Sequence, residues 1–299
     1  MKRYLPHSDF IACARLTPEL YRLAFGVIAI ELLYELALDF ISAVLASFPP
    51  EVADAYYYGT TAAGLLGQLF SFGFLAAAVF LVARHLHFRP PTSLIGPTVD
   101  ARNGFVLALC AGLGVFLLIE ILPPYWSTAN AVIFGLGKWL LLLPFALAGL
   151  TVQTAAEELF YRGYIQQQLA ARFDKPWIWL TGTNLLFAIA HWDSGSNPVD
   201  SVEYVIWAFF FGLAASDLTA RTGNLGAAIG FHLANNIYAF LFFAEFDSPD
   251  SGLALLLYPP SDDLLPPSVG PEPFPSLSLG IQLVRLLVMW LAARLLLRR

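Results

Sequence analysis

The chain has 299 residues, of which 58% are hydrophobic and 13% charged, and its mean hydropathy is +0.66. Soluble domains carry about 25% charged and about 45–50% apolar residues, so this composition excludes an ordinary soluble protein and favours a membrane protein. The net charge of −6 makes nucleic acid a poor partner. The two cysteines, Cys13 and Cys110, give no basis for a disulfide framework.

Eight stretches are candidates for spanning helices, each of which needs about 20 mainly apolar residues. In chain order they are 20–48, 60–84, 103–122, 129–153 and beyond, 176–192, 202–219, 225–246 and 277–297. Proline and glycine stand in the gaps, as is typical of helix ends. The sequence therefore predicts an all-α, polytopic membrane protein with about eight transmembrane helices, forming a single transmembrane domain over residues 1–299. The stretch 247–275, rich in proline, serine and acids, is expected to be one long extracytoplasmic loop.

The charges alternate from one predicted loop to the next. Basic residues occupy the first and every second loop and the C-terminus: Lys2, Arg3, Arg15, Arg22, Arg84, Arg89, Arg102, Arg172, Lys175, Arg221, Arg294, Arg298 and Arg299. The intervening loops contain acids instead: Glu51, Asp54, Asp193, Asp200, Asp247, Asp250, Asp262 and Asp263. Because cytoplasmic loops are enriched in Lys and Arg, both termini are expected in the cytoplasm. The short basic loops favour a bacterial inner membrane, with the lipid bilayer as a partner.

Three polar clusters interrupt the hydrophobic stretches. They are Glu157-Glu158-x3-Arg162, Phe187-x3-His191 and His232-x3-Asn236. Ionisable groups are costly inside a membrane, so an intramembrane functional site is the default hypothesis for them. Residues four apart share a helix face, so Glu158 is expected to pair with Arg162, whereas Glu157, turned by about 100°, escapes it. Glu157 is thus a candidate general base, and His232 and Asn236 project together as possible oxyanion donors.

A hairpin is predicted to bring two of these clusters together. Asp174-Lys175-Pro176 indicates a turn, because the residue before proline is disfavoured in helical conformation. Glu157 precedes Asp174 by 17 residues and His191 follows it by 17. At 1.5 Å per residue, both would lie about 25 Å from the turn and face one intramembrane cavity. The glutamines Gln166–Gln168 are expected in a hairpin tip that projects into water, and Gly223, Gly226 and Gly230 predict close packing of the helix that carries His232.

The ordered motifs EExxxR, FxxxH and HxxxN read here as EELFYR, FAIAH and HLANN. In this order they resemble the CPBP family of intramembrane proteases, also called the Abi or CAAX prenyl protease 2-like family. The match covers about residues 153–238, where the catalytic motifs lie. The resemblance implies an eight-helix intramembrane endopeptidase that hydrolyses peptide bonds of a peptide or membrane-protein substrate in a cavity open to the cytosol. Eukaryotic relatives trim three residues after a prenylated cysteine, a substrate that does not transfer to this chain.

The same resemblance implies a role for each motif residue. Carried over by position, Glu157 would activate water with assistance from His191, and His232 and Asn236 would stabilise the oxyanion. Structural or orienting roles would fall to Glu158, Arg162 and Phe187.

Metal dependence is a separate question. Glu157, His191 and His232 offer three zinc ligands, with water as the fourth. Against zinc, the chain has no HExxH motif, a zinc site needs an outer partner for each histidine, and Asn236 suits an oxyanion donor better than a ligand. The favoured expectation is hydrolysis without a cofactor, with a zinc metalloprotease as the alternative.

Two further functions stay open on the sequence alone. The first is a family member that keeps the site but acts as a binding or immunity protein. The second is a small transporter that uses buried acids, because Glu31, Glu35 and Asp39 form an acidic stripe on the first helix at i, i+4 and i+8. That stripe also suits a face of the same cavity.

Overall fold

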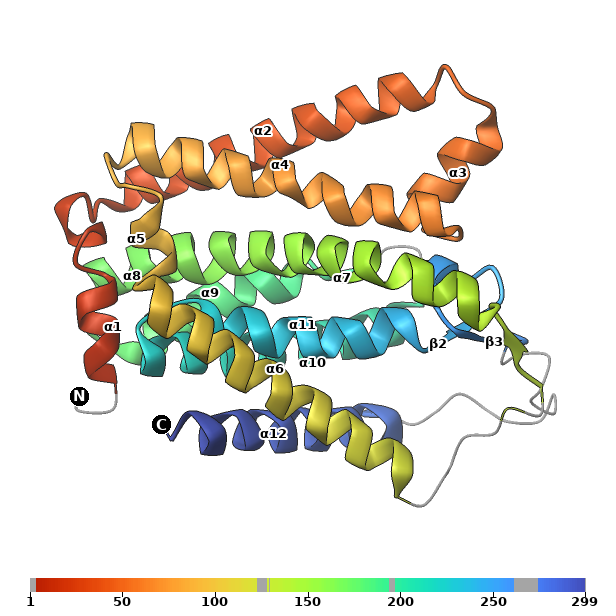
Figure 1. The fold of residues 1–299 in the computed structure, drawn as a ribbon. Helices are drawn as coiled ribbons and strands as arrows, with labels where there is room; N and C mark the ends of the chain where they lie inside the picture. The colour runs from red at the N-terminus through yellow and green to blue at the C-terminus, as the bar shows by residue number, and fades with distance from the viewer. Residues whose placement is uncertain (1–3, 123–127, 129, 194–196, 261–273, 299) are drawn as a thin grey trace.

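A computed structural model describes residues 4–122, 128, 130–193, 197–260 and 274–298. Helices dominate it, and the long ones run side by side in one bundle (Figure 1). The first half of the chain forms α1 (Leu5–Phe10), a short 3-10 turn (Ala14–Leu16), α2 (Leu20–Leu45), α3 (Pro50–Tyr58), α4 (Ala62–Leu86), α5 (Thr92–Ile95) and α6 (Thr98–Ile121). The second half forms α7 (Leu136–Glu158), the π-helical turn η3 (Leu159–Gln166), α8 (Gln167–Arg172), α9 (Pro176–Ile189), α10 (Pro198–Thr222), α11 (Gly226–Leu241) and α12 (Leu277–Leu297).

The prediction of an all-α polytopic fold is confirmed. Among the described residues, five helices are long and apolar enough to cross a membrane: α4, α6, the continuous run Leu136–Arg172, α10 and α12. The other three predicted spans correspond to α2, α9 and α11, which are helical but are not among the helices that are both long and apolar enough to cross a membrane. The 26 residues of α2 include Glu31, Glu35 and Asp39, whereas α9 and α11 have only 14 and 16 residues. The total of eight crossings therefore stays a prediction.

Both termini lie at one end of the bundle, and three short strands lie at the other (Figure 1). The strands β1 (Val132–Ile133), β2 (Phe243–Glu245) and β3 (Leu256–Tyr258) form a sheet in the order β1-β3-β2, antiparallel in its first pair and parallel in its second. Residues 132–133, expected within a helix, are a strand because the helix begins only after Gly135, whose φ is +58°. We call this the strand end of the bundle.

The stretch expected to be one long loop is structured in its first part. The carbonyl oxygens of Leu241 and Leu253 accept hydrogen bonds from the Trp139 indole, and Gly252 N–H donates to the Gly59 carbonyl. Strand β3 and a 3-10 turn at Ser251–Leu253 follow from this anchoring. The remainder, 261–273, lies outside the described residues, as do Pro123-Pro124, which were expected to stop the third span.

The glutamines Gln166–Gln168 are buried, so the prediction of a wet hairpin tip is wrong. Gln166 donates to the Ser216 carbonyl on α10, whereas α5 and the segment before it cover Gln167 and Gln168. Gln167 accepts a hydrogen bond of 2.5 Å from the buried Arg89 and donates to the Leu94 carbonyl, while Gln168 contacts His87 at 2.6 Å. Buried polar groups need such partners, and here segments far apart in the sequence supply them.

Glycines allow the closest helix contact, between α6 and α11, as predicted for Gly226 and Gly230. A Cβ atom at Gly226 would overlap the carbonyl oxygen of Ala101, and one at Gly230 would overlap that of Phe105. Gly223 ends α10 at a φ of +68°, a conformation that L side chains rarely adopt. This close approach fixes the helix that carries His232 and Asn236.

We expect Gly230→Leu to destabilise the protein by at least about 1–3 kcal/mol, because the added side chain forces α6 and α11 apart. Gly114→Leu is the matched control, since nothing lies within 4 Å of a Cβ atom placed there. Thermal unfolding of the two purified variants in the same detergent measures the difference. Equal unfolding midpoints would contradict the glycine contact.

Candidate active site

The first motif lies where helix α7 passes into a π-helical turn. Helix α7 ends at Glu158, the π-helical residues are Leu159–Gln166, and α8 continues the rod to Arg172. A π-helical turn adds a residue per turn and is frequent at functional sites. The chain therefore changes its helical phase immediately after Glu157 and Glu158.

Glu158 forms the buried centre of the site. Its Oε1 accepts from Arg162 Nη1 at 3.0 Å and from His232 Nδ1 at 2.8 Å, and the side chains of Glu158 and Arg162 are 0% exposed. Arg162 also donates to Asn184 Oδ1 at 3.2 Å, and its guanidinium lies over the Phe187 ring at 4.4 Å. The predicted pairing of Glu158 with Arg162 is thus present, and it joins three helical segments.

Glu157 points away from Arg162 and toward a cavity. Its Oε1 accepts from Gln153 Nε2 at 2.6 Å, and its Oε2 is buried, makes no hydrogen bond and lies 3.7 Å from His232 Nε2. That separation is too long for a direct hydrogen bond. Glu157 therefore keeps one oxygen available for chemistry.

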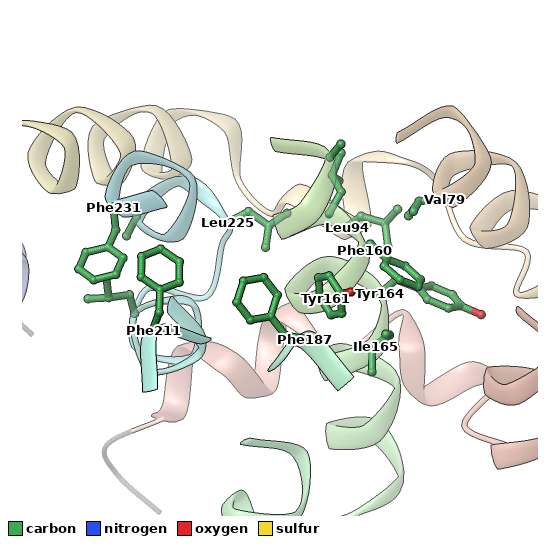
Figure 2. Packing of buried hydrophobic residues seen from close by; sticks show 14 of the residues in the cluster. Val79, Leu94, Phe160, Tyr161, Tyr164, Ile165, Phe187, Phe211, Leu225 and Phe231 are labelled. Atoms are coloured by element: carbon green, nitrogen blue, oxygen red, sulfur yellow. The ribbon is translucent and has the colours of Figure 1, made fainter. Parts of the chain in front are cut away.

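His191 is held by its own helix. Its Nδ1 lies 2.7 Å from the carbonyl oxygen of Phe187, and because a carbonyl can only accept, Nδ1 carries the hydrogen. The Nε2 atom of the neutral ring is then a free acceptor that can take a proton. Phe187 is 1% exposed and lies between Tyr161 and Phe211 (Figure 2), with its ring centroid 4.3 Å from that of His191.

The residues of the third motif, His232 and Asn236, are also held by hydrogen bonds. Since a carboxylate can only accept, His232 donates from Nδ1 to Glu158, which leaves Nε2 facing Glu157. Asn236 donates to Gln153 Oε1 at 2.8 Å, and an amide has a second N–H that this bond does not use. Gln153 thus links Asn236 to Glu157 in one chain of hydrogen bonds.

These groups line one cavity of about 390 Å³. Its walls include the four predicted catalytic residues together with Phe187; the other lining residues are Gln153, Tyr204, Trp207, Phe211, Asn235, Tyr238, Ala239, Phe240, Gln282 and Arg285. We call it the motif cavity. The hairpin geometry expected for Glu157 and His191 agrees with this placement, because both reach the same cavity from opposite sides of the turn at 173–175.

Sequence reasoning missed several of these residues. Gln153 lies four residues before Glu157, a spacing that places both on one helix face, so its signal was present in the sequence. Arg285 was visible as a charge inside the last span. Tyr204 and Trp207 had no signal, because aromatic residues recur throughout the apolar helices.

The acidic stripe on α2 does not line the motif cavity. Glu31, Glu35 and Asp39 are exposed on that helix, which diverges from α4 toward α3 (Figure 1). The expectation that the stripe forms a face of the same cavity is therefore wrong.

The side chains in and around the motif cavity can be compared with the ligands that a metal ion needs. Among the described residues, no three His, Cys, Asp or Glu side chains converge in a way that could hold a metal ion. The outer partners that zinc ligands need are nevertheless present, since Nδ1 of His191 contacts a backbone carbonyl and Nδ1 of His232 a carboxylate. The need for outer partners therefore does not count against zinc, although in the described part of the chain the three predicted ligands, which line one cavity, do not converge closely enough to hold a metal ion.

Two further cavities adjoin the motif cavity, and both extend toward the strand end. One, of about 620 Å³, lies between the first turns of α10 and α12 and shares Tyr204, Trp207 and Gln282 with it. The other, of about 380 Å³, lies among α2, α3, α4 and α7 and shares Gln153 and Phe240. On the opposite side, toward the termini, the buried side chains of Glu158, Arg162 and Gln166 close the site.

Comparison with known proteins agrees with this architecture. Residues 138–238 match the profile of a family described as Rce1-like, type II CAAX prenyl endopeptidase Rce1-like, and this stretch contains all three motifs. An uncharacterized protein of Bacillus subtilis (strain 168), YyaK, is 27% identical over 192 residues, which cover 61% of this chain and 62% of that relative. No solved structure matches the chain significantly.

With its apolar helices and three ordered motifs, the chain is a multi-pass integral membrane protein whose residues 138–238 match the Rce1-like family of type II CAAX prenyl endopeptidases.

Proposed function

We propose that the protein is an intramembrane endopeptidase that hydrolyses peptide bonds of peptide or membrane-protein substrates, with Glu157, His191, His232 and Asn236 as its catalytic residues. The observation that carries this proposal is the contrast between two adjacent carboxylates. Glu158 is fully buried, its Oε1 is bound by both Arg162 and His232, and it is not among the residues that line the motif cavity, whereas Glu157 lines that cavity and its Oε2 has no hydrogen-bond partner. A carboxylate in this position can accept a proton from water.

In the proposed reaction, Glu157 takes a proton as the water oxygen bonds to the peptide carbonyl carbon. The resulting oxyanion accepts hydrogen bonds from the second N–H of Asn236 and from Nε2 of His232 in its imidazolium form. When the C–N bond breaks, the proton passes from Glu157 to the leaving amine, with His191 Nε2 as a relay. The products are a carboxylic acid and an amine, and water is the one co-reactant.

The hydrogen bond of His232 to Glu158 defines what the proposed step requires of the ring. Because Nδ1 of His232 donates to Glu158, Nε2 can donate to the oxyanion only when both ring nitrogens carry hydrogen. Gln153 and Glu158 act in this proposal as positioning residues, because they reach the reacting atoms through Glu157 and His232.

We expect Glu157→Gln to abolish proteolysis, because an amide cannot accept the proton of water. Mass-spectrometric mapping of peptide ends in membranes expressing wild type or variant works without choosing a substrate beforehand. Glu31→Gln is the matched control, since it removes an acid from a helix outside the motif cavity. Peptide ends present with wild type and Glu31→Gln, but absent with Glu157→Gln, would support the proposal.

Wild-type peptide ends that persist in both Glu157→Gln and His232→Ala would contradict the proteolytic function. A cellular effect of the protein that survives Glu157→Gln would favour the binding or immunity function instead. Sensitivity to Glu31→Gln but not to His232→Ala would favour transport.

We further propose that hydrolysis needs no metal, because the predicted ligands do not converge as a set of three in the described part of the chain. Proteolysis should then be unchanged by 1,10-phenanthroline, which chelates zinc. The isomer 1,7-phenanthroline, which chelates poorly, controls for effects of the aromatic compound on the membrane. Loss of activity with the first compound alone, restored by added zinc, would establish a metalloprotease.

The distribution of charge also leads us to propose an orientation in a bacterial inner membrane, with both termini in the cytoplasm. The basic loops lie at the end that carries the termini, whereas α3, which carries Asp54, and the segment between β2 and β3, which carries Asp250, lie toward the strand end (Figure 1). In this orientation the cavities that adjoin the motif cavity face the extracytoplasmic side. That differs from the cytosolic opening that the family resemblance implies.

Cysteine labelling in intact cells tests this orientation. In a background with Cys13 and Cys110 replaced by serine, an impermeant maleimide should label Asp54→Cys directly and Lys175→Cys only after the membrane is opened. The native side chains of Asp54 and Lys175 are both exposed, so cysteines at these positions are accessible to the reagent. Asn235→Cys, inside the motif cavity, should react from outside with a small charged thiosulfonate. The reverse pattern would overturn the orientation.

A further inference from the structure

The last helix, α12, presents a cation to the motif cavity. Arg285 is half-buried and lies within the apolar span Leu277–Leu297, whereas Arg294 and Arg298 lie at the end of that helix. A charged side chain at such a position is costly and marks a functional site by default. The motifs that define the family match do not include Arg285, which lies outside residues 138–238.

Arg285 forms no ion pair with any described carboxylate. Its guanidinium lies over the rings of Phe116 and Tyr238, at 5.6 and 5.5 Å, and these rings are stacked on each other at 4.2 Å. Glu120 accepts instead from the Tyr238 hydroxyl at 2.6 Å, and none of the described ion pairs involves Arg285. The aromatic pair thus orients the cation while its N–H donors remain available to the cavity.

The position of Arg285 relative to the catalytic groups is set by Tyr238. Tyr238 follows His232 by six residues on α11. At 1.5 Å per residue this is about 9 Å along the helix axis, toward the strand end. From Asn236, two residues before Tyr238, the same rise gives about 3 Å. An extended peptide covers about 3.3 Å per residue, so a group on Arg285 would lie roughly one to three residues from the bond held at His232 and Asn236.

We propose that Arg285 is a specificity-determining residue that binds a carboxylate of the substrate roughly one to three residues from the cleaved bond. This inference rests on the proposed function, because it places the peptide by the catalytic groups. Arginine matches a carboxylate with two parallel hydrogen bonds, and a substrate carboxylate would form the ion pair that no described protein carboxylate makes with Arg285. The carboxylate is either the C-terminus of the substrate or an acidic side chain near it.

Peptide binding to the full-length Glu157→Gln variant in detergent tests the proposal without any cleavage. The probes are amino-terminally fluorescent seven-residue peptides of alanine, leucine and valine, ending either in a free carboxylate or in an amide. A third probe has the amide end and an internal aspartate, and a fourth has asparagine in its place. Fluorescence anisotropy gives the dissociation constants.

We expect a carboxylate-bearing probe to bind about tenfold or more tightly than its neutral twin. Preference for the free acid over the amide identifies the C-terminus as the ligand, and preference for aspartate over asparagine identifies the side chain. Adding Arg285→Gln should remove the preference, whereas Arg285→Lys should retain part of it. Arg294→Gln is the matched control, because Arg294 lies on the same helix over the Trp290 ring, at 4.7 Å, away from the motif cavity.

Equal affinity for charged and neutral probes, a preference that survives Arg285→Gln, or no saturable binding of any carboxylate probe would each overturn the proposal. Thermal unfolding of Arg285→Gln beside Arg294→Gln checks that the fold is kept. Failure of the proposed function would show differently, as wild-type peptide ends that persist in Glu157→Gln.

Discussion

The carboxylate of Glu158 joins α7 to the π-helical turn and to α11 at the centre of an apolar bundle. It accepts one hydrogen bond from Arg162 and one from His232, with no exposure to solvent. Removing one member of a buried charge pair leaves the other uncompensated, at a cost of about 3–5 kcal/mol. The three side chains are therefore mutually dependent, and the orientation of the His232 ring follows from them.

As a consequence of this arrangement, the two adjacent carboxylates, Glu157 and Glu158, lie in different environments. Glu158 is neutralised by a fixed cation and loses its freedom to take part in proton transfer. Glu157, one residue earlier and turned by about 100°, meets an amide from Gln153 and the edge of His232 instead. The same pair of residues thus provides a structural anchor and a candidate base, and the helical rotation between them separates the two roles.

Short helices and close packing create the space for this chemistry. Helices α9 and α11 have 14 and 16 residues, and the chain leaves α9 just before His191. Non-helical backbone inside a membrane is tolerated where it lines a cavity, which is the position of His191. The glycine contacts between α6 and α11 fix the helix that carries His232 and Asn236, so this wall of the cavity is held by close packing on the far side of α11.

The sequence by itself determined the fold class, the helical segments and the identity of the motif residues, because hydrophobic runs and i, i+4 spacing are local properties. It also determined the pairing of Glu158 with Arg162, which lies within one continuous helical rod. Gln153 had the same kind of local signal. These features need no knowledge of how the helices pack.

Only the tertiary structure decided which faces of the apolar helices meet. Nothing in the local sequence of Gln167 and Gln168 shows that α5 and the segment before it cover them. Nor does it show that His232 reaches Glu158 across 74 residues. Arg285 and Tyr238 become neighbours because α12 packs beside α6 and α11. In helices that are apolar on every side, the faces toward lipid and toward protein have similar compositions. The inward face is therefore set by contacts between segments distant in the chain.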